Sequence, residues 1–504
     1  MMSDLNLTNH KDKLFFWFIL ALYIVYSFTF TYSNEPFFGF SKTLDYKYIF
    51  NKNLNSDFIW AYSFNRDILN GVNISNWSFP PNYHFLELVL SFIPTLISPN
   101  LDFYIFLISP IQIILLAFGL SYIQKKEFNF FVNCSNIFLC TLTLFLFYRF
   151  FDVLLSSIFL KDFYISFFLE QLFHNSGTHS LSAILAVIIY YKFFIFENYN
   201  NLKIKFYILF FICSLSDIFF AVYLLSFLGI RFLYFRKIIN FKTIILCFII
   251  SIVTIIITYL LNPSLKIHLS NSINITKETK DFVEIALLSF VLFLLPTIFF
   301  YFLNIKKLLT NDLRCLFYGC FLIHLFNVST GLTQNFFSIK YSAIIVPVTI
   351  LFASILIKQL NLKQLMSLTF LNCFALFGFI INVLFFKPVS ILNTYNNEIS
   401  CIEKIEKNKT YKIIATYWSG KIIFEKLDRK LSFIQITPFF YFYEWHYNNA
   451  WSDLRKESKN FGNFILISEG INPQTIKKLG NLANPYCNNK IYLIKNTKLV
   501  LPKE

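Results

Sequence analysis

Long apolar runs, separated by short polar segments, fill the first three quarters of the sequence. A helix that crosses a membrane needs about 20 mostly apolar residues, so these runs predict about thirteen membrane-spanning helices, several of them short. The predicted spans are 14–32, 84–98, 102–123, 130–147, 150–168, 180–196, 204–215, 217–234, 243–261, 284–304, 313–329, 340–357 and 366–386. The sequence therefore predicts an all-α polytopic membrane domain over residues 1–386, with a large first outer loop at 33–83.

Residues 387–504 have a different pattern, in which shorter apolar runs alternate with helical stretches. The segments are YKIIATYW, GKIIFEKL, KLSFIQI, NFILIS, NPQTIKKLG and KIYLIK. Alternation of strands and helices predicts a small, separate α/β domain that is soluble. Two of the nine cysteines, Cys401 and Cys487, lie in it, one near each end. They can form a disulfide if the domain lies outside the cytoplasm, and the sequence leaves this open.

The composition agrees with a membrane protein and changes the meaning of the charge. Hydrophobic residues make up 56% of the chain and charged residues 14%, whereas a soluble domain has about 25% charged residues. A net charge of +16 would suggest nucleic-acid binding in a soluble protein. In membrane proteins, however, Lys and Arg collect in the cytoplasmic loops. We therefore expect a lipid bilayer, and no nucleic acid, as the partner of these charges.

The basic residues also predict the orientation of the chain. Lys11 and Lys13 precede a first span that is too long for a cleaved signal peptide, so we expect a retained helix whose N-terminus is cytoplasmic. The other predicted inner-loop residues are Arg149, Lys203, Lys205, Arg231, Arg236, Lys237, Lys242, Lys306, Lys307, Arg314, Lys358 and Lys363. Lys125 and Lys126 are the exceptions, because the predicted spans place them outside. An odd number of spans puts the C-terminal domain outside the cytoplasm, on the same side as the first loop.

The segment 204–234 allows two interpretations. As one helix, it places Ser216 and Asp217 in the middle of the membrane; as a hairpin of two short helices, it places them at the outer surface. An aspartate at the centre of a membrane helix costs about 3 kcal/mol. The basic cluster that follows Phe235 also requires an inner end there. Both arguments favour the hairpin.

The longest polar stretch in the first half of the chain is SDFIWAYSFNRDILNGVNISNWSFPPNYHFLEL, which holds the candidate site residues Asp57, Asp67, His84 and Glu87. The pattern predicts a helix over SFNRDIL that breaks at Gly71. His84 and Glu87 share one face of the first turn of the next span. A carboxylate at the membrane boundary can act as a general base towards a sugar or amine acceptor, or hold Mg²⁺ or Mn²⁺ beside a phosphate leaving group. The alternative is a solvated connector whose aspartates cap helices.

Other predicted outer segments add candidates, namely Glu170, His174 and His179 in LEQLFHNSGTHSLS, Asp217 in SLSD, and Lys340 with Tyr341 in SIKYSAIIVP. Imidazole and carboxylate groups can bind a metal or a polar substrate. A cation beside an aromatic ring at the start of a span can hold a lipid phosphate. The alternatives are helix caps at the interface for the acids and histidines, and snorkelling for the lysine.

These stretches resemble the GT-C superfamily of integral membrane glycosyltransferases, which includes oligosaccharyltransferases, protein mannosyltransferases and lipid A aminoarabinose transferases. The stretch around Asp57 resembles the acid-bearing outer loop that follows the first span of the family. HNSGTHSLSAIL is similar to the polar lead-in to a middle helix, and SLSD to the polar turn between two short spans. SIKYSAIIVP is similar to a late basic-aromatic segment, with Lys340 where Arg is common. The resemblance covers most of residues 1–386 in layout.

The resemblance implies an inverting transfer of a sugar from a polyprenyl-phosphate carrier to a glycan, lipid or protein acceptor at the outer face of the plasma membrane. The first-loop acid of the family corresponds best to Asp57 and next to Asp67, and it would deprotonate or position the acceptor. Lys340, together with Lys277 or Lys280, would hold the departing phosphate. The remaining candidates would contact the substrates: His84, Glu87, His174, His179, Asp217 and Tyr341.

The alternative function is a multi-pass transporter, or a flippase for lipid-linked glycans, without transferase activity. Transporters often show internal repeats and place functional charges near the middle of the bilayer. The sequence shows no such repeat, and its outer acids lie at predicted helix ends on one side. This pattern favours the transferase.

Overall fold

The computed structural model describes residues 2–32, 59–74, 77, 84–98, 100–124, 129–159, 178–196, 204–235, 238–261, 311–329, 343–386, 395–406, 411–437, 439–441, 461–469 and 471–498. The chain divides into two compact units. The helical unit comprises Met1–Thr43, Asn82–Leu86 and Phe106–Pro388, and the sheet unit comprises Leu44–Pro81, Glu87–Ile105 and Val389–Glu504. The sheet unit therefore joins the C-terminal part of the chain to segments that precede residue 106.

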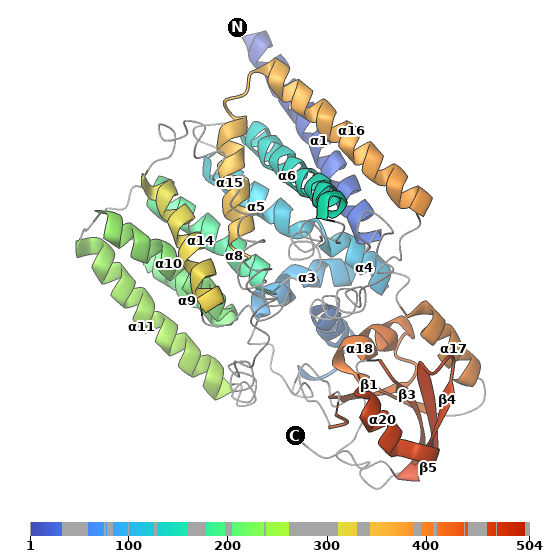
Figure 1. The fold of residues 1–504 in the computed structure, drawn as a ribbon. Helices are drawn as coiled ribbons and strands as arrows, with labels where there is room; N and C mark the ends of the chain where they lie inside the picture. Colours follow the sequence, from blue (N-terminus) through green and yellow to red (C-terminus); the bar gives the residue numbers. More distant parts are fainter. Residues whose placement is uncertain are drawn as a thin grey trace. The chain divides into compact units, whose positions relative to one another are not determined.

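The described part of the helical unit consists of helices packed mainly through aromatic side chains. The helices are α1 (Met2–Tyr32), α5 (Ile111–Gln124), α6 (Phe130–Phe159), α8 (Thr178–Tyr190) with its π-helical extension η2 (Tyr191–Phe196), α9 (Ile204–Ser216), α10 (Ile218–Phe235), α11 (Ile238–Leu261), α14 (Asn311–Ser329), α15 (Ile345–Ile357) and α16 (Leu362–Phe386). Figure 1 shows α1, α6 and α16 side by side, and α10 beside α11 and α14. Tyr23 of α1 packs on Phe138 of α6, with ring centroids 5.4 Å apart, and such aromatic pairs bury large apolar areas.

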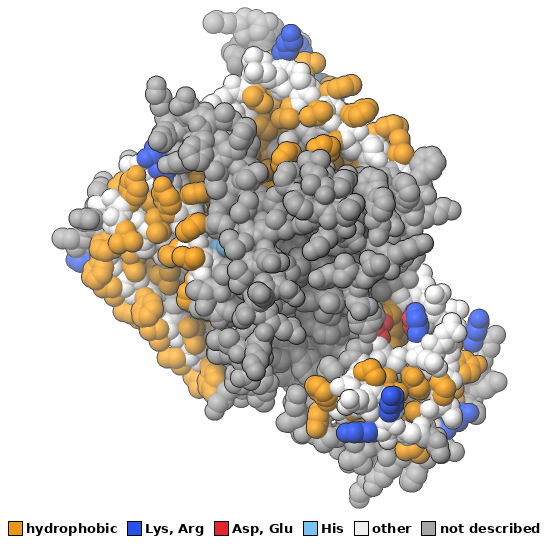
Figure 2. Space-filling model, in the orientation of Figure 1, with side chains coloured by type: hydrophobic (Ala, Val, Ile, Leu, Met, Phe, Trp, Pro, Cys, Tyr) orange, Lys and Arg blue, Asp and Glu red, His pale blue; other side chains and the backbone are white. Residues whose placement is uncertain are grey.

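Among the described residues, seven helices are long and apolar enough to cross a membrane, and three shorter apolar helices accompany them. The outer faces of α11 and α16 are apolar, as shown by Leu260 (72% exposed) and Phe370 (75% exposed). Figure 2 shows hydrophobic side chains gathered over these two helices. Helices with such exposed apolar faces are suited to contact with lipid. The predicted multi-pass membrane protein is confirmed, while the count of about thirteen spans is not.

The contacts of α5 show the direction in which it runs. Ser109, just before α5, lies 2.9 Å from Ser27 near the end of α1, measured between the two hydroxyl oxygens. Further along α5, Phe118 packs on Phe16 near the start of α1, with centroids 6.3 Å apart. The two helices are therefore antiparallel.

This direction corrects the predicted path of the chain. The predicted spans make 102–123 parallel to 14–32, because they count 84–98 as a crossing between them. That prediction is wrong, since an antiparallel pair allows no single crossing in between. The helix observed there, α3 (Phe85–Ile97), has 13 residues and is about 20 Å long, against about 30 Å of hydrocarbon core.

The corrected path also explains why Lys125 and Lys126 broke the positive-inside rule in the predicted path. Asn129, just before α6, donates a hydrogen bond of 2.7 Å to Asp12 near the start of α1. Gln124 ends α5 at the same end of the helical unit, because α5 runs antiparallel to α1. Lys125 and Lys126 stand between Gln124 and Asn129 in the sequence. Both ends of their segment therefore lie at the end of the unit that carries the N-terminal lysines, as the positive-inside rule requires.

Arg149 provides a second correction. The sequence predicts an inner loop at this residue, but α6 continues through it without a break. The guanidinium carbon lies 4.1 Å from the ring centroid of Phe379 and 6.0 Å from that of Tyr26. The faces of aromatic rings attract a cation, so the helix can bury this arginine instead of ending at it.

The predicted hairpin at 204–234 is confirmed. It consists of α9 and α10, with Asp217 as the single residue between them. The Asp217 carboxylate accepts a hydrogen bond of 3.0 Å from the backbone N–H of Phe219, and thereby caps α10. A polar turn in an apolar segment was sufficient to locate this reversal.

The sheet unit contains the predicted α/β fold. Its C-terminal elements are α17 (Asn396–Glu406), β1 (Tyr411–Thr416), α18 (Tyr417–Lys426), β2 (Ser432–Ile436), β3 (Phe461–Ile467), α20 (Pro473–Leu479), the 3₁₀ turn η7 (Gly480–Leu482), β4 (Ala483–Tyr486) and β5 (Ile491–Lys498). The strand order is β2-β1-β3-β5-β4. β1 is parallel to β2 and β3, and β5 is antiparallel to β3 and β4. The sequence pattern missed the helix α17 and, among the strands, β4, a short edge strand that contains Pro485.

The same unit contains residues that precede the second predicted span. Residues 59–69 are helical and the chain turns at Gly71, whose φ of 74° favours glycine. This confirms the helix predicted over SFNRDIL. Most of α3 and of α4 (Leu101–Ile108) also belongs to the sheet unit.

Cys401 and Cys487 form a disulfide, with their Cα atoms 6.5 Å apart. It joins α17 to the turn that follows β4. The other seven cysteines are free. The sequence left a disulfide between these two cysteines open, and the structure contains it.

Replacing Cys401 with Ser should lower the free energy of unfolding of the sheet unit by about 2–5 kcal/mol, because the bond closes a long loop. Thermal unfolding of the full-length protein in detergent measures the loss. Cys373→Ser, at a free cysteine of α16, is the matched control and should change little. Recovery of both Cys401 and Cys487 as alkylated thiols from non-reduced protein would contradict the bond.

Candidate functional site

Three of the predicted site residues, His84, His179 and Asp217, meet in the helical unit. His179 Nδ1 lies 2.9 Å from Asp217 Oδ2, and the rings of His84 and His179 are 5.5 Å apart. All three side chains are buried. We call this group the His–Asp cluster. It brings together residues from three polar segments that are far apart in the sequence.

Each member of the His–Asp cluster stands at the beginning of a helix. His84 immediately precedes α3, His179 is the second residue of α8, and Asp217 precedes α10. The backbone N–H of His84 donates a hydrogen bond of 2.6 Å to the carbonyl of Ser216. The N–H of Leu86 donates to the Ser216 hydroxyl at 3.1 Å. The hairpin turn therefore holds the start of α3, and His84 takes a left-handed backbone conformation with a φ of 62°.

The surroundings of Asp217 keep its carboxylate charged. Burial raises its pKa, but the charge and hydrogen bond of His179 outweigh this, with further help from His84 and Ser182, and hold the pKa at about 2. The partial positive charge of helix starts acts in the same direction. A carboxylate on Nδ1 fixes the tautomer and orientation of an imidazole, an arrangement suited to binding a polar group or exchanging a proton.

Asp217→Asn should remove a pH-dependent part of the stability. The pKa of Asp217 is about 2, against an ordinary value of 3.8. A lowered pKa contributes stability that is present above the ordinary value and is lost as the pH falls through the folded value. The difference between wild type and variant should therefore be about 2 kcal/mol near neutral pH and shrink towards pH 2. Thermal unfolding in detergent across this range measures it, and a difference that does not change with pH would contradict the pairing.

Asp67 lies in a different group, in the sheet unit. Asp67 Oδ2 accepts a hydrogen bond of 3.1 Å from the indole N–H of Trp77, and Oδ1 forms an ion pair with Arg429. Asp67 is buried, with 2% of its side chain exposed. Both of its oxygens thus have partners within the chain. This environment suits a structural carboxylate better than a base that must accept a proton from a substrate.

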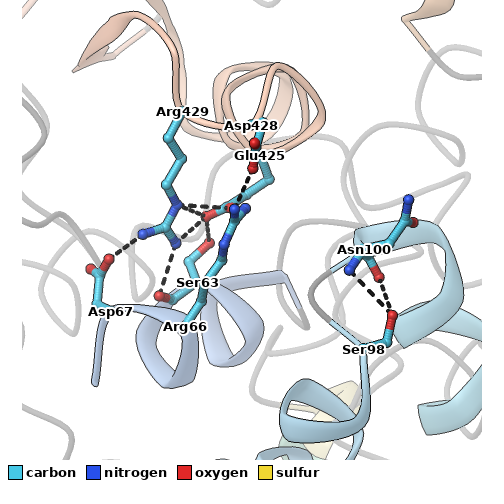
Figure 3. Close-up of polar contacts among 8 residues, drawn as sticks. All are labelled: Ser63, Arg66, Asp67, Ser98, Asn100, Glu425, Asp428 and Arg429. Carbon is cyan, nitrogen blue, oxygen red and sulfur yellow. Dashed lines mark hydrogen bonds and ion pairs between the residues drawn. The ribbon is translucent and has the colours of Figure 1, made fainter. Parts of the chain in front are cut away.

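Asp67 is part of a network of charged and polar groups drawn in Figure 3, which we call the clamp and which consists of Ser63, Arg66, Asp67, Glu425, Asp428 and Arg429. Sequence reasoning missed its C-terminal half, because GKIIFEKL was considered only as one of the alternating segments of the α/β domain. The available signal was the spacing of Glu425 and Arg429, four residues apart, which suits an ion pair on a helix.

The other predicted residues fall elsewhere. Glu87 is buried in the first turn of α3 and belongs to the sheet unit, whereas His84 belongs to the helical unit. The remaining residues predicted for the site lie outside the described residues: Asp57, Glu170, His174, Lys277, Lys280, Lys340 and Tyr341. In the described part of the chain, no three His, Cys, Asp or Glu side chains form a group that could hold a metal ion. The divalent metal therefore stays a prediction from the sequence.

No protein-family model and no curated protein matches this sequence. Two solved structures are similar in fold. ArnT from Cupriavidus metallidurans bound to undecaprenyl phosphate matches with a TM-score of 0.55 and 10% sequence identity, over 97% of this chain and 99% of that one. The apo state of the same protein matches with a TM-score of 0.52 and 10% identity, over 89% of this chain and 94% of that one. The chain therefore has the fold of ArnT, and the predicted similarity to lipid A aminoarabinose transferases is confirmed at the level of the fold.

Proposed function

We propose that this protein is a membrane glycosyltransferase that moves a sugar from a polyprenyl-phosphate carrier to a lipid, glycan or protein acceptor. The observation that carries the proposal is the shared fold with ArnT over nearly the full length of both chains. ArnT was captured with undecaprenyl phosphate, a polyprenyl phosphate. The multi-pass helical unit of our chain, with apolar faces on α11 and α16, suits a substrate that stays in the bilayer.

The proposed reaction is a single displacement at C1 of the sugar. An oxygen or nitrogen of the acceptor attacks C1 from the face opposite the carrier phosphate, and Asp57 takes the proton of the acceptor. The bond between C1 and the phosphate oxygen breaks, and the phosphate keeps the electron pair. Lys340 and Tyr341 hold the departing phosphate, so the enzyme acts through positioning and charge stabilisation.

The His–Asp cluster supports a substrate-binding role in this scheme. His179, oriented by Asp217 at 2.9 Å, would bind a hydroxyl or a phosphate oxygen, and His84 lies beside it. His174 and Glu87 keep the substrate-contact roles that the resemblance implies. No step here is assigned to Mg²⁺ or Mn²⁺.

We also propose that the protein lies in the plasma membrane, with a cytoplasmic N-terminus and an extracytoplasmic C-terminal domain. Two observations support this orientation. The Cys401–Cys487 disulfide suits an oxidising compartment. The corrected direction of α5 brings the flanks of Lys125 and Lys126 to the end of the helical unit that holds Asp12, as expected of a cytoplasmic end.

Mass spectrometry of lipid-linked glycans from wild-type and deletion strains tests the function. We expect the deletion strain to accumulate one polyprenyl-phosphate sugar and to lose the glycan modification made from it. Purified protein in detergent should then convert that lipid to free polyprenyl phosphate in the presence of the acceptor. Accumulation without any such conversion by the purified protein would instead indicate a flippase.

A further inference from the structure

The clamp connects two segments of the sheet unit that are far apart in the sequence. Ser63 donates a hydrogen bond of 2.5 Å to Glu425 across 362 residues. Arg66 donates to the other oxygen of Glu425 at 3.1 Å. From the turn after α18, Arg429 pairs with Asp67 and donates to the backbone carbonyl of Ser63 at 3.0 Å. Figure 3 shows these side chains converging between the helix at 59–69 and α18.

Glu425 is the centre of the clamp. Its side chain is fully buried, with 0% exposed, and it accepts hydrogen bonds from Ser63, Arg66 and Arg429. Burial by itself lowers the pKa of Arg429, but the charges of Glu425 and Asp67 outweigh it and raise this pKa above its ordinary value. Both guanidinium groups therefore stay charged. Buried ion pairs of this kind depend strongly on geometry, because a misplaced partner leaves a charge without compensation.

The backbone after α18 is held in a costly conformation that serves the clamp. The N–H of Arg429 donates to the carbonyl of Phe424 at 3.0 Å, and that of Asp428 to Glu425 at 3.0 Å. These two bonds form a Schellman motif, in which glycine is the usual residue at the position of Asp428. Asp428 and Arg429 have φ values of 54° and 56°, which cost about 1–2 kcal/mol for each non-glycine residue. The turn aims both side chains back at the helix at 59–69.

Contacts on α3 and α4 hold the same helix from elsewhere in the sheet unit. The Asn65 side chain donates to the carbonyl of Leu88 at 3.0 Å and to the Ser91 hydroxyl at 2.8 Å, both in α3. The ring of Tyr62 lies 4.8 Å from that of Tyr104 in α4. The helix at 59–69 is therefore fixed both by α3 and α4 and by the C-terminal domain.

We propose that Arg429 is a positioning residue for sugar transfer, because from the C-terminal domain it fixes the helix at 59–69, which follows Asp57 in the sequence. This inference rests on the proposed function. Asp57 lies only two residues before the first described residue of that helix. Arg429 itself has no contact with the reacting atoms in this scheme. Its substitution should loosen the helix first, and reduce turnover as a consequence.

Hydrogen exchange of the full-length protein in detergent tests the anchoring, with Arg429→Gln and Asp428→Asn as a matched pair. Arg429→Gln should speed exchange of the amides at 59–69 by about tenfold or more, because it breaks the contacts to both Asp67 and Ser63. Asp428→Asn should leave exchange within about twofold, because Asp428 is 68% exposed in its ion pair with Arg66 and exposed pairs contribute little. Amides of β3 serve as the internal reference in both variants.

Transfer kinetics test the consequence. Arg429→Gln should lower kcat by about tenfold or more with KM for the lipid-linked sugar nearly unchanged, since the fault lies in orientation rather than in donor binding. Arg429→Lys keeps the charge but not the forked contacts, and should recover only part of the loss. If Arg429→Gln does not fold, Asp67→Asn breaks one arm of the clamp and gives the same two readouts.

The outcomes separate this inference from the proposed function. Unchanged exchange at 59–69 in both Arg429→Gln and Asp67→Asn would overturn the anchoring. Faster exchange with full transfer activity would overturn the positioning role and leave a purely structural one. Absence of transfer by the wild-type protein would overturn the proposed function together with the positioning role, whereas the exchange data would still decide the anchoring.

Discussion

Asp57→Asn should abolish sugar transfer while leaving the protein as stable as the wild type. The proposed reaction needs a base for the acceptor proton, and loss of a general base typically lowers the rate by about 10²–10⁴-fold. Lipid-linked glycan profiles of cells, and turnover of the purified protein, measure the loss. The variant should accumulate the same sugar lipid as the deletion strain.

Asp67→Asn is the variant with which Asp57→Asn must be compared, because the sequence alone predicted either aspartate as the first-loop acid. Asp67 is bound to Trp77 and Arg429, so its amide variant should lose stability and show faster exchange at 59–69. Any loss of transfer should be smaller and accompany that loosening. A stable Asp57→Asn protein with wild-type transfer would contradict the assignment of the base, and transport would then become the leading explanation.

Glu425→Gln should lower the free energy of unfolding of the sheet unit by about 3–5 kcal/mol, because removing one partner from a buried ion-pair network leaves the other charges uncompensated. Two guanidinium groups, those of Arg66 and Arg429, depend on this carboxylate. Thermal or denaturant unfolding of the full-length protein, followed by exchange at the strands, measures the effect. The side-chain shape is kept, so the loss reports charge rather than packing.

Glu403→Gln is the matched control, since Glu403 is an exposed carboxylate on α17 in the same unit. Substitutions of this kind usually change stability by less than about 0.5 kcal/mol. Equal effects of Glu425→Gln and Glu403→Gln would show that the clamp contributes nothing specific. A large effect of Glu425→Gln alone would show that the C-terminal domain and the helix at 59–69 are stabilised together.

Local patterns explain what the sequence predicted correctly. The polar residues around Asp217 interrupt an apolar run, and the cost of a charge within a membrane helix favours a turn there over one continuous helix. In the C-terminal domain, short apolar strands alternate with helices, so β1, α18, β2 and β3 could be recognised individually. The breaking of the helix at Gly71 has a similarly local cause.

The direction of the helices could not be read in the same way, because it depends on a count of crossings. One short apolar segment, 84–98, was sufficient to reverse the predicted direction of 102–123, and the contact between Ser27 and Ser109 corrects it. The inner loop predicted at Arg149 was wrong for another reason. The aromatic partners of Arg149, Tyr26 and Phe379, come from helices that are distant in the sequence. A single-sequence pattern carries no information about such pairing.

The candidate site also contains both features that local sequence predicts and features that depend on contacts between distant segments. His84, His179 and Asp217 were each selected for their chemistry at predicted helix ends, and the fold brought them together. The clamp could not be foreseen, because Asp67 and Arg429 are 362 residues apart and only the folded sheet unit joins them.

The separation of the two halves of the clamp has a consequence for biosynthesis. At about 5–20 residues per second, roughly 20–70 s pass between translation of Ser63 and translation of Glu425. During this interval the ribosome synthesises the later membrane helices, and Arg66 and Asp67 do not yet have their ion-pair partners Glu425 and Arg429. A nascent chain released before residue 425 cannot close the clamp, so the helix at 59–69 gains these contacts only after α18 has been synthesised.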